Sequence, residues 1–282
     1  MDTKRISVYG SSGFIGSRWM KFDPSSISIP RESNFPDAAS TDVLYFISTT
    51  HNYNIFNQPH KDVDTNLTKL IDVLESCKNT NKDIVFNFVS SWFVYGMNAS
   101  LNTLEETLPN PTGFYSITKR AAEQMLICYC QTFGMKYRIF RMTNIIGETD
   151  KGVSLQKNAI QYMIGLLKKN EPVKLYNGGA NVRDFMYVDD ACSALRVCID
   201  AAPTNEIINI SNMEPVAIGE IIKYSKEKLR SCSDVISVET PTFHKVVQVK
   251  DVCLNNHRLL SYGYKPSTTT YQGVDRLLYD KE

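Results

Sequence analysis

The chain has 282 residues, of which 43% are hydrophobic and 22% are charged. Both fractions are ordinary for a globular protein and exclude a disordered chain, a collagen and a small disulfide-stapled scaffold. Since 31 basic residues balance 30 acidic residues, the net charge is +1, and we expect neither nucleic acid nor a membrane as a partner.

The sequence carries no sign of export, membrane insertion or metal binding. No apolar run reaches the roughly 18 residues that span a bilayer, and the start, MDTKRISVYG, lacks a signal-peptide core, so we expect a cytoplasmic protein. The seven cysteines are an odd number without a C-x-x-C pair, which favours free thiols. The four histidines share no ligand spacing, so no metal site is expected.

In chain order, short β-rich runs alternate with amphipathic helical patterns. The strands expected in the first half are 4–9, 26–30, 43–47, 84–89 and 137–140. The helices expected there are 62–78 and 116–133, because their apolar residues recur every three or four positions. Strand alternating with helix indicates an α/β fold with a doubly wound parallel sheet.

The second half is more mixed and contains no linker rich in proline or glycine. We expect helices at 155–168, 189–201 and 218–229, and strands at 173–176 and 207–210. The chain therefore predicts two interleaved units rather than two separate domains. Residues 1–150 with about 187–212 would form the larger unit, and about 151–186 with 213–282 a smaller C-terminal lobe.

A glycine loop directly follows the first expected strand. Gly10, Gly13 and Gly16 are spaced G-x-x-G-x-x-G, and a helix is expected to begin near Phe14. In this context backbone N–H groups and the positive end of a helix can hold a pyrophosphate, and no side chain blocks its approach. A Rossmann-type dinucleotide site is predicted, and the expected cofactor contacts in the loop are Gly10, Ser12, Gly13, Phe14, Ile15 and Gly16.

The end of the second expected strand bears on the choice of cofactor. Arg31 follows that strand and favours NADP(H), because an arginine there can meet a ribose 2′-phosphate; Arg18 could assist it. The adjacent Glu32 leaves NAD(H) open, since an acidic residue would bind a free 2′-hydroxyl. Arg31 could also be a solvated loop charge.

Tyr115 and Lys119 are four residues apart in an expected helix, so both lie on one helical face. A nearby ammonium would lower the pKa of the phenol, which could then exchange a proton with a hydroxyl or carbonyl oxygen. Ser91 follows the strand expected at 84–89, at the sheet edge where open α/β folds bind ligands.

Several further motifs follow one another along the chain. They are GSSGFIG at 10–16, Asn66 in DTNLTKLIDVLE, SSWFVYG at 90–96, YSITK at 115–119, RMTNIIG at 141–147, RDFMYVDD at 183–190 and SYGYKP at 261–266. In this order they resemble the extended short-chain dehydrogenase/reductases of the NAD-dependent epimerase/dehydratase family, which act on nucleotide sugars. The family relation implies a nucleotide-diphosphate sugar as substrate.

The resemblance also implies residue roles. Ser91, Tyr115 and Lys119 would be catalytic, with Ser91 orienting the sugar C4 oxygen. The implied substrate contacts are Ser91, Trp92, Asn144 and Arg183, and the implied cofactor contacts beyond the glycine loop are Ser48, Asn66, Tyr115 and Lys119. Arg183 would bind the diphosphate, although it could instead pair with Asp184 or Asp189, and Asn144 could instead cap a turn.

The loop Ser48–Asn52 should flank cofactor and sugar. In the C-terminal lobe, Phe243, His244 and Arg258 are candidates for the nucleotide pocket that match no specific motif.

The resemblance does not identify which of the family's reactions the chain catalyses. Family dehydratases carry Asp-Glu after the catalytic hydroxyl residue, whereas Trp92 and Phe93 stand here and cannot transfer a proton. Only 26 residues separate Gly16 from Val43, which predicts a small adenine pocket with weaker cofactor binding, and together with Arg31 this favours an exchangeable NADPH. We therefore favour a 4-ketoreductase acting on 4-keto-6-deoxy sugars. The alternatives are a 4-epimerase with retained NAD and a non-catalytic dinucleotide sensor or scaffold.

The helices expected at 62–78 and 115–133 resemble those that pair family subunits as a four-helix bundle. A homodimer is therefore expected, with Met125, Cys128 and Tyr129 near its apolar stripe.

Overall fold

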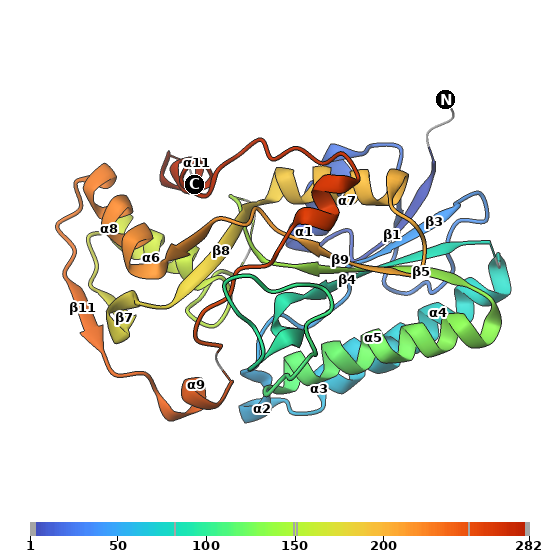
Figure 1. The fold of residues 1–282 in the computed structure, drawn as a ribbon, viewed down its shortest axis with the longest axis horizontal. Coiled ribbons are helices and arrows are strands. Elements are labelled where there is room, and N and C mark those ends of the chain that lie inside the picture. Colours follow the sequence, from blue (N-terminus) through green and yellow to red (C-terminus); the bar gives the residue numbers. More distant parts are fainter. Residues whose placement is uncertain (1–3, 82, 149, 151, 248, 280–282) are drawn as a thin grey trace.

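The computed structural model describes residues 4–81, 83–148, 150, 152–247 and 249–279. Its centre is a six-stranded parallel sheet in the order β2-β1-β3-β4-β5-β9 (Figure 1). The strands are β1 (Ile6–Tyr9), β2 (Ile27–Ile29), β3 (Asp42–Tyr45), β4 (Val85–Ser91), β5 (Lys136–Met142) and β9 (Glu206–Ile210). This sheet confirms the predicted doubly wound α/β fold.

Helices cover both faces of the sheet. One face carries α1 (Phe14–Phe22) and α7 (Val188–Ala201), and the other carries α4 (Lys69–Thr80) and α5 (Phe114–Phe133) (Figure 1). Successive side chains of a strand point to opposite faces, so Ile6 and Val8 belong to the core beneath α7, whereas Tyr9 belongs to the core beneath α4 and α5.

The connection between β1 and β3 is as short as the sequence predicts. β2 has only three residues and lies at the sheet edge, and residues 30–41 contain neither helix nor strand. The strand order turns back on itself between β1 and β3, which is where the carboxyl ends of open α/β sheets leave a crevice for ligands.

The helix predicted at 62–78 is interrupted by a π-helical turn. It consists of α3 (Lys61–Val63), the π-helix η1 (Asp64–Thr68) and α4. Asn66 lies in η1, and its amide donates to the hydroxyls of Thr49 and Thr118, each at 2.9 Å. Three- and four-residue periodicity does not predict this turn, within which Asn66 contacts residues distant in the sequence.

We use "second lobe" for about 151–186 with 213–282, the division predicted from the sequence. It contains the parallel pair β11-β7 and the strands β8 and β10, which form a three-stranded sheet with β6 of the larger unit. The bounds are β6 (Asn144–Ile146), β7 (Val173–Tyr176), β8 (Val182–Tyr187), β10 (Pro215–Ala217), β11 (Val235–Val238), α6 (Ala159–Lys168), α8 (Ile218–Leu229), α9 (Thr242–Val247), α10 (His257–Ser261) and α11 (Thr270–Tyr279). The second lobe also contains the 3-10 turn η3 (Asn177–Gly179), and the short pieces outside it are α2 (Asn54–Asn57) and the 3-10 turn η2 (Trp92–Tyr95).

The helix predicted to begin at Leu155 begins at Ala159 instead. Asn158 precedes it with φ 57° and ψ 59°, a left-handed conformation that breaks the helical path. Within the described part of the chain, no helix is long and apolar enough to cross a membrane.

Candidate active site

A cavity of about 490 Å³ lies where the carboxyl ends of the central strands meet the second lobe. Most of the residues predicted to form the site line it. They are Gly10, Gly13, Phe14, Ile15, Gly16, Ser48, Ser91, Trp92, Tyr115, Lys119, Asn144 and Arg183. Residues as far apart in the sequence as Gly10 and Arg183 therefore share one cavity.

The glycine loop forms a tight turn into α1. Gly10 has φ +77°, and the Gly13 amide donates to the Gly10 carbonyl at 3.0 Å. A Cβ atom on Gly16 would lie 2.2 Å from the Gly10 oxygen, so only glycine allows the loop and α1 to approach this closely. Because bare backbone and the amino end of a nine-residue helix face the cavity, these residues fit a dinucleotide pyrophosphate.

Two residues predicted for the cofactor side stand apart from the cavity. Ser12 and Arg31 are exposed and do not line it. Arg18 is engaged elsewhere, since its guanidinium binds both oxygens of Asp189, with Nη2 at 2.6 Å from Oδ2. Arg18 is therefore not free to assist Arg31.

Asn66 lies behind the cavity wall and does not line it. Its side-chain oxygen accepts hydrogen bonds from the Ser48 hydroxyl at 3.1 Å and from the Thr49 amide at 2.9 Å. Asn66 is 2% exposed. It therefore holds the loop that carries Ser48 rather than facing the cavity itself.

Tyr115 and Ser91 come from α5 and from the end of β4. Tyr115 is 8% exposed and Ser91 is 9% exposed. Burial raises the pKa of the Tyr115 phenol, while hydrogen bonding with the hydroxyls of Ser91 and Ser48 acts in the opposite direction. The phenol therefore faces two hydroxyls inside the cavity.

Lys119 is 2% exposed and lies one helical turn beyond Tyr115. Its ammonium donates to the Val89 carbonyl at 2.7 Å and lies 4.2 Å from the centroid of the Phe88 ring. Burial lowers the pKa of Lys119 to about 7. The expected lowering of the Tyr115 pKa by Lys119 is wrong for this structure, because desolvation dominates and the amine is turned toward β4.

An aromatic wall borders Tyr115 in the cavity. The rings of Trp92 and Phe93 stack with centroids 3.9 Å apart, and Phe93 meets Tyr115 edge-on at 5.9 Å. No carboxylate stands at either position of this wall. The cavity near the Tyr115 phenol is therefore apolar on this side.

Arg183 is 5% exposed and also lines the cavity, with its guanidinium carbon 5.4 Å from the centroid of the Trp92 ring. It donates to the carbonyls of Val182 and Lys250, each at 2.7 Å, and to that of Val249 at 2.6 Å. Burial lowers the pKa of Arg183 to about 10. A buried cation held by neutral carbonyls suits an anionic ligand.

The alternative roles considered for Arg183, an ion pair with Asp184 or Asp189, and for Asn144, the cap of a turn, are wrong. Asp184 accepts hydrogen bonds from the Ser211 hydroxyl and the Glu214 amide, and Asp189 pairs with Arg18. Asn144 lies in β6 and donates to the Asp184 carbonyl at 3.0 Å, so it does not cap a turn.

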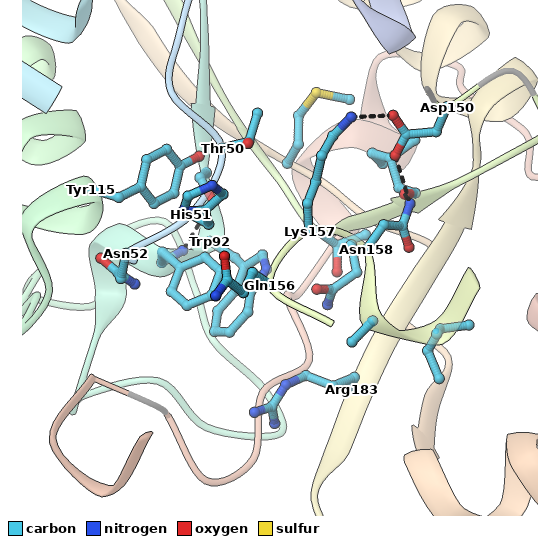
Figure 2. Close-up of a pocket in the computed structure, with 18 of the residues that line it drawn as sticks. Thr50, His51, Asn52, Trp92, Tyr115, Asp150, Gln156, Lys157, Asn158 and Arg183 are labelled. Carbon is cyan, nitrogen blue, oxygen red and sulfur yellow. Dashed lines mark hydrogen bonds and ion pairs between the residues drawn. The ribbon is translucent and has the colours of Figure 1, made fainter. Parts of the chain in front are cut away.

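Sequence reasoning missed the segment that forms the opposite wall (Figure 2). Lys157 pairs with Asp150 at 2.5 Å, and Asn158 donates to the other oxygen of Asp150 at 3.3 Å. Lys157 and Asn158 fell within the helix expected at 155–168, so neither was considered as a residue of the site. The left-handed conformation of Asn158 leaves no trace in the spacing of apolar residues, so the sequence pattern did not show that the helix begins after it.

The C-terminal lobe contributes one of its three candidates. His244 lines the cavity, where it hydrogen bonds to the Tyr53 hydroxyl and packs 4.8 Å from the Tyr176 ring. Phe243 does not line the cavity but packs on Tyr53 at 5.2 Å. The expectation for Arg258 is wrong, because it binds Glu206 at 3.0 Å away from the cavity.

Among the described residues, no group of three or more histidine, cysteine or acidic side chains could hold a metal ion.

Known proteins share both the sequence pattern and the fold. The sequence model of the NAD dependent epimerase/dehydratase family matches residues 32–211. GDP-6-deoxy-D-mannose reductase of Pseudomonas aeruginosa is 24% identical over an alignment that covers 99% of this chain and 98% of that protein. dTDP-D-glucose 4,6-dehydratase of Dictyostelium discoideum is 30% identical over 179 residues; these cover 60% of this chain but only 40% of that protein.

Two solved structures share the architecture. RMD from Pseudomonas aeruginosa complexed with NADPH superimposes with a TM-score of 0.85 and 22% identity, covering 98% of each chain. UDP-glucose 4-epimerase of Thermus thermophilus in complex with NAD gives a TM-score of 0.81 and 21% identity, covering 97% of this chain and 98% of that one. At these identities the likeness establishes the fold.

Proposed function

Because the chain belongs to the NAD dependent epimerase/dehydratase family, we propose that it reduces the C4 ketone of a nucleotide-linked 4-keto-6-deoxy sugar with NADPH. The proposal is supported chiefly by the convergence of Ser91, Tyr115 and Lys119 with the glycine loop around one cavity. When bound beside that loop, the nicotinamide dinucleotide would supply the hydride.

The Tyr115 phenol would supply the proton that reduction of a ketone requires. A ketone that accepts a hydride also needs a proton on its oxygen, and burial keeps the Tyr115 phenol protonated at neutral pH. Ser91 would hold the same oxygen by a hydrogen bond, and solvent would return the proton to the phenol after turnover. A 4-epimerase would use the same residue twice, first to take a proton from the C4 hydroxyl and then to return one to the C4 oxygen.

The wall at Trp92 and Phe93 argues against dehydration. Elimination of water across C5 and C6 needs a side chain that transfers a proton, and neither indole nor benzyl can do so. The same rings offer an apolar surface that suits the methyl group of a 6-deoxy sugar. Arg183 would bind the diphosphate on the other side of Trp92.

The donors near the end of β2 support NADPH over NADH. Ser11 and Ser28 hydroxyls lie 2.6 Å apart at the surface, and Arg31 follows β2 in the next turn. Hydroxyl and guanidinium donors suit a 2′-phosphate better than a free 2′-hydroxyl. Glu32 beside Arg31 is the observation that keeps NAD(H), and with it a 4-epimerase, as the second candidate.

Absorbance at 340 nm in a stopped-flow instrument tests the reaction. NADPH mixed with the protein and 4-keto-6-deoxy sugars carried on UDP, dTDP, GDP or CDP should be consumed with one of them. An epimerase would interconvert 4-hydroxy sugar nucleotides without net change at 340 nm. No NADPH consumption with any of these substrates would refute the reductase.

Tyr115→Phe tests the proton donor. It keeps the ring against Phe93 and removes only the hydroxyl, so turnover should fall by about 100-fold or more while NADPH still binds. Unchanged turnover would remove Tyr115 from the proposed mechanism.

We also propose that the protein is a homodimer through α4 and α5, which lie side by side on one face of the sheet (Figure 1). Their outer surface exposes apolar side chains, among them Ile71 at 39%, Ile117 at 45% and Phe133 at 43%. Light scattering should give twice the 32.0 kDa chain mass, and Ile117→Arg should shift the protein toward the monomer. A 32.0 kDa species in the unaltered protein would refute the dimer.

A further inference from the structure

A buried acidic residue lies directly behind the catalytic candidates. Glu123 is in α5, one helical turn after Lys119, and its side chain is 0% exposed. One carboxylate oxygen accepts a hydrogen bond from the Ser90 hydroxyl at 2.6 Å. Carboxylates are rarely buried unless they are paired, so this one requires a reason.

Arg141 supplies the pairing. It lies in β5 opposite Ser90 of β4 and donates Nε and Nη2 to the two oxygens of Glu123 at 3.0 and 2.8 Å. Arg141 is 1% exposed, and its third donor, Nη1, reaches the Glu105 carbonyl at 3.2 Å. Two parallel bonds fix the carboxylate plane in one orientation.

These contacts join the two elements that carry the catalytic candidates. Ser90 precedes Ser91 at the end of β4, whereas Glu123 shares α5 with Tyr115 and Lys119. The hydrogen bond from Ser90 to Glu123 therefore links the strand end that carries Ser91 to the helix that carries Tyr115. Lys119 adds a second tie, because its amine donates to the Val89 carbonyl of the same strand.

We propose that Glu123 is a positioning residue, which with Arg141 and Ser90 locks the end of β4 to α5 and so holds Ser91, Tyr115 and Lys119 in their working arrangement. The inference rests on the proposed function for the role of those three residues. It goes beyond that function by assigning a buried residue that does not line the cavity.

The charge of Glu123 also affects the pKa of Lys119. Burial lowers the pKa of Lys119, and the negative charge of Glu123 raises it. The other charged groups around Glu123 are Arg120 in α5, whose Nη1 lies 2.9 Å from Oε2, and Arg141 in β5. The Tyr95 ring, 4.7 Å from the Arg141 guanidinium carbon, completes the surroundings.

The decisive variant is Glu123→Gln, which keeps the size and removes the charge. With lysines labelled at 13Cε, the Lys119 signal, assigned from Lys119→Arg, should titrate at least about one pH unit lower than in the unaltered protein. Turnover at neutral pH should fall by about tenfold or more, since small displacements of reacting groups have effects of this size. Glu123→Asp, which keeps the charge, should bring the titration midpoint of Lys119 part of the way back to that of the unaltered protein.

Two further variants separate positioning from stability. Ser90→Ala leaves the Glu123–Arg141 pair intact and should lower turnover without moving the Lys119 titration. Arg196→Gln is the matched control, because Arg196 pairs with Asp200 in α7, its side chain is 21% exposed, and it does not line the cavity. It should leave turnover near that of the unaltered protein and should not lower the Lys119 titration.

The Lys119 titration is independent of whether the protein is a reductase. If no sugar nucleotide is reduced by the unaltered protein, the proposed function fails, while a lowered Lys119 titration in Glu123→Gln still supports the contact. A folded Glu123→Gln protein with unchanged Lys119 titration overturns the electrostatic part. Unchanged turnover in both Glu123→Gln and Ser90→Ala overturns the positioning role.

Discussion

The glycine loop offers a sharp test of how backbone geometry sets cofactor binding, through the substitution Gly16→Ala. The added Cβ would stand 2.2 Å from the Gly10 oxygen and 2.9 Å from the Gly10 carbonyl carbon. Ordinary contacts of this kind are about 3.5 Å, so the loop must move by more than about 1 Å. Both partners are backbone atoms, and no side chain can rotate away to relieve the contact.

The expected cost follows from that displacement. Forcing an extra carbon into a packed site costs about 2–3 kcal/mol, which corresponds to a loss of roughly 4–12 °C in Tm for a chain of this size. The same movement would turn loop amides away from the position proposed for the cofactor pyrophosphate. One lost hydrogen bond to a charged group is worth about 1.5–3 kcal/mol, so the Kd for NADPH should rise by about tenfold or more.

Thermal unfolding and NADPH fluorescence titration measure the two effects. Gly165→Ala is the matched control, because it lies within α6 and its Cβ would meet no atom within 4 Å. It should leave NADPH binding unchanged and stabilise the protein by up to about 1 kcal/mol, since alanine favours helix over glycine. If Gly16→Ala bound NADPH as tightly as the unaltered protein and melted at the same temperature, the close approach of loop and helix would be refuted.

Three further predictions concern single side chains. Arg183→Gln should weaken UDP, GDP or dTDP binding by at least about tenfold in calorimetry and leave the Kd for NADPH unchanged; equal loss for both would contradict a diphosphate contact. Arg31→Ala should reduce the preference for NADPH over NADH by about tenfold, and an unchanged ratio would make Arg31 a solvated loop charge. Burial lowers the pKa of Lys119 from 10.5 to about 7, so the unfolded chain binds more protons there between these values. The unaltered protein should therefore gain stability relative to Lys119→Met as pH rises through this range, and a urea-unfolding difference that is independent of pH would contradict the burial of a titrating amine.

Local patterns determined the architecture because their causes lie within short stretches of chain. Apolar runs at 43–47 and 84–89 gave strands covered on both faces, and the strand–glycine–helix order placed the loop at 10–16. The four-residue spacing of Tyr115 and Lys119 put both on one helical turn. Periodicity and steric freedom act between neighbours, so they can be recognised without coordinates.

The tertiary structure alone decided the electrostatics and the far walls of the site. The spacing of Tyr115 and Lys119 suggested a lowered phenol pKa, yet burial reversed its direction, and burial depends on what packs around both residues. Arg258 was expected in the nucleotide pocket but pairs with Glu206 outside the cavity. Lys157 lines the cavity next to Asn158, whose left-handed conformation the sequence pattern does not predict. Desolvation and long-range pairing are properties of the folded surroundings, which sequence spacing does not encode.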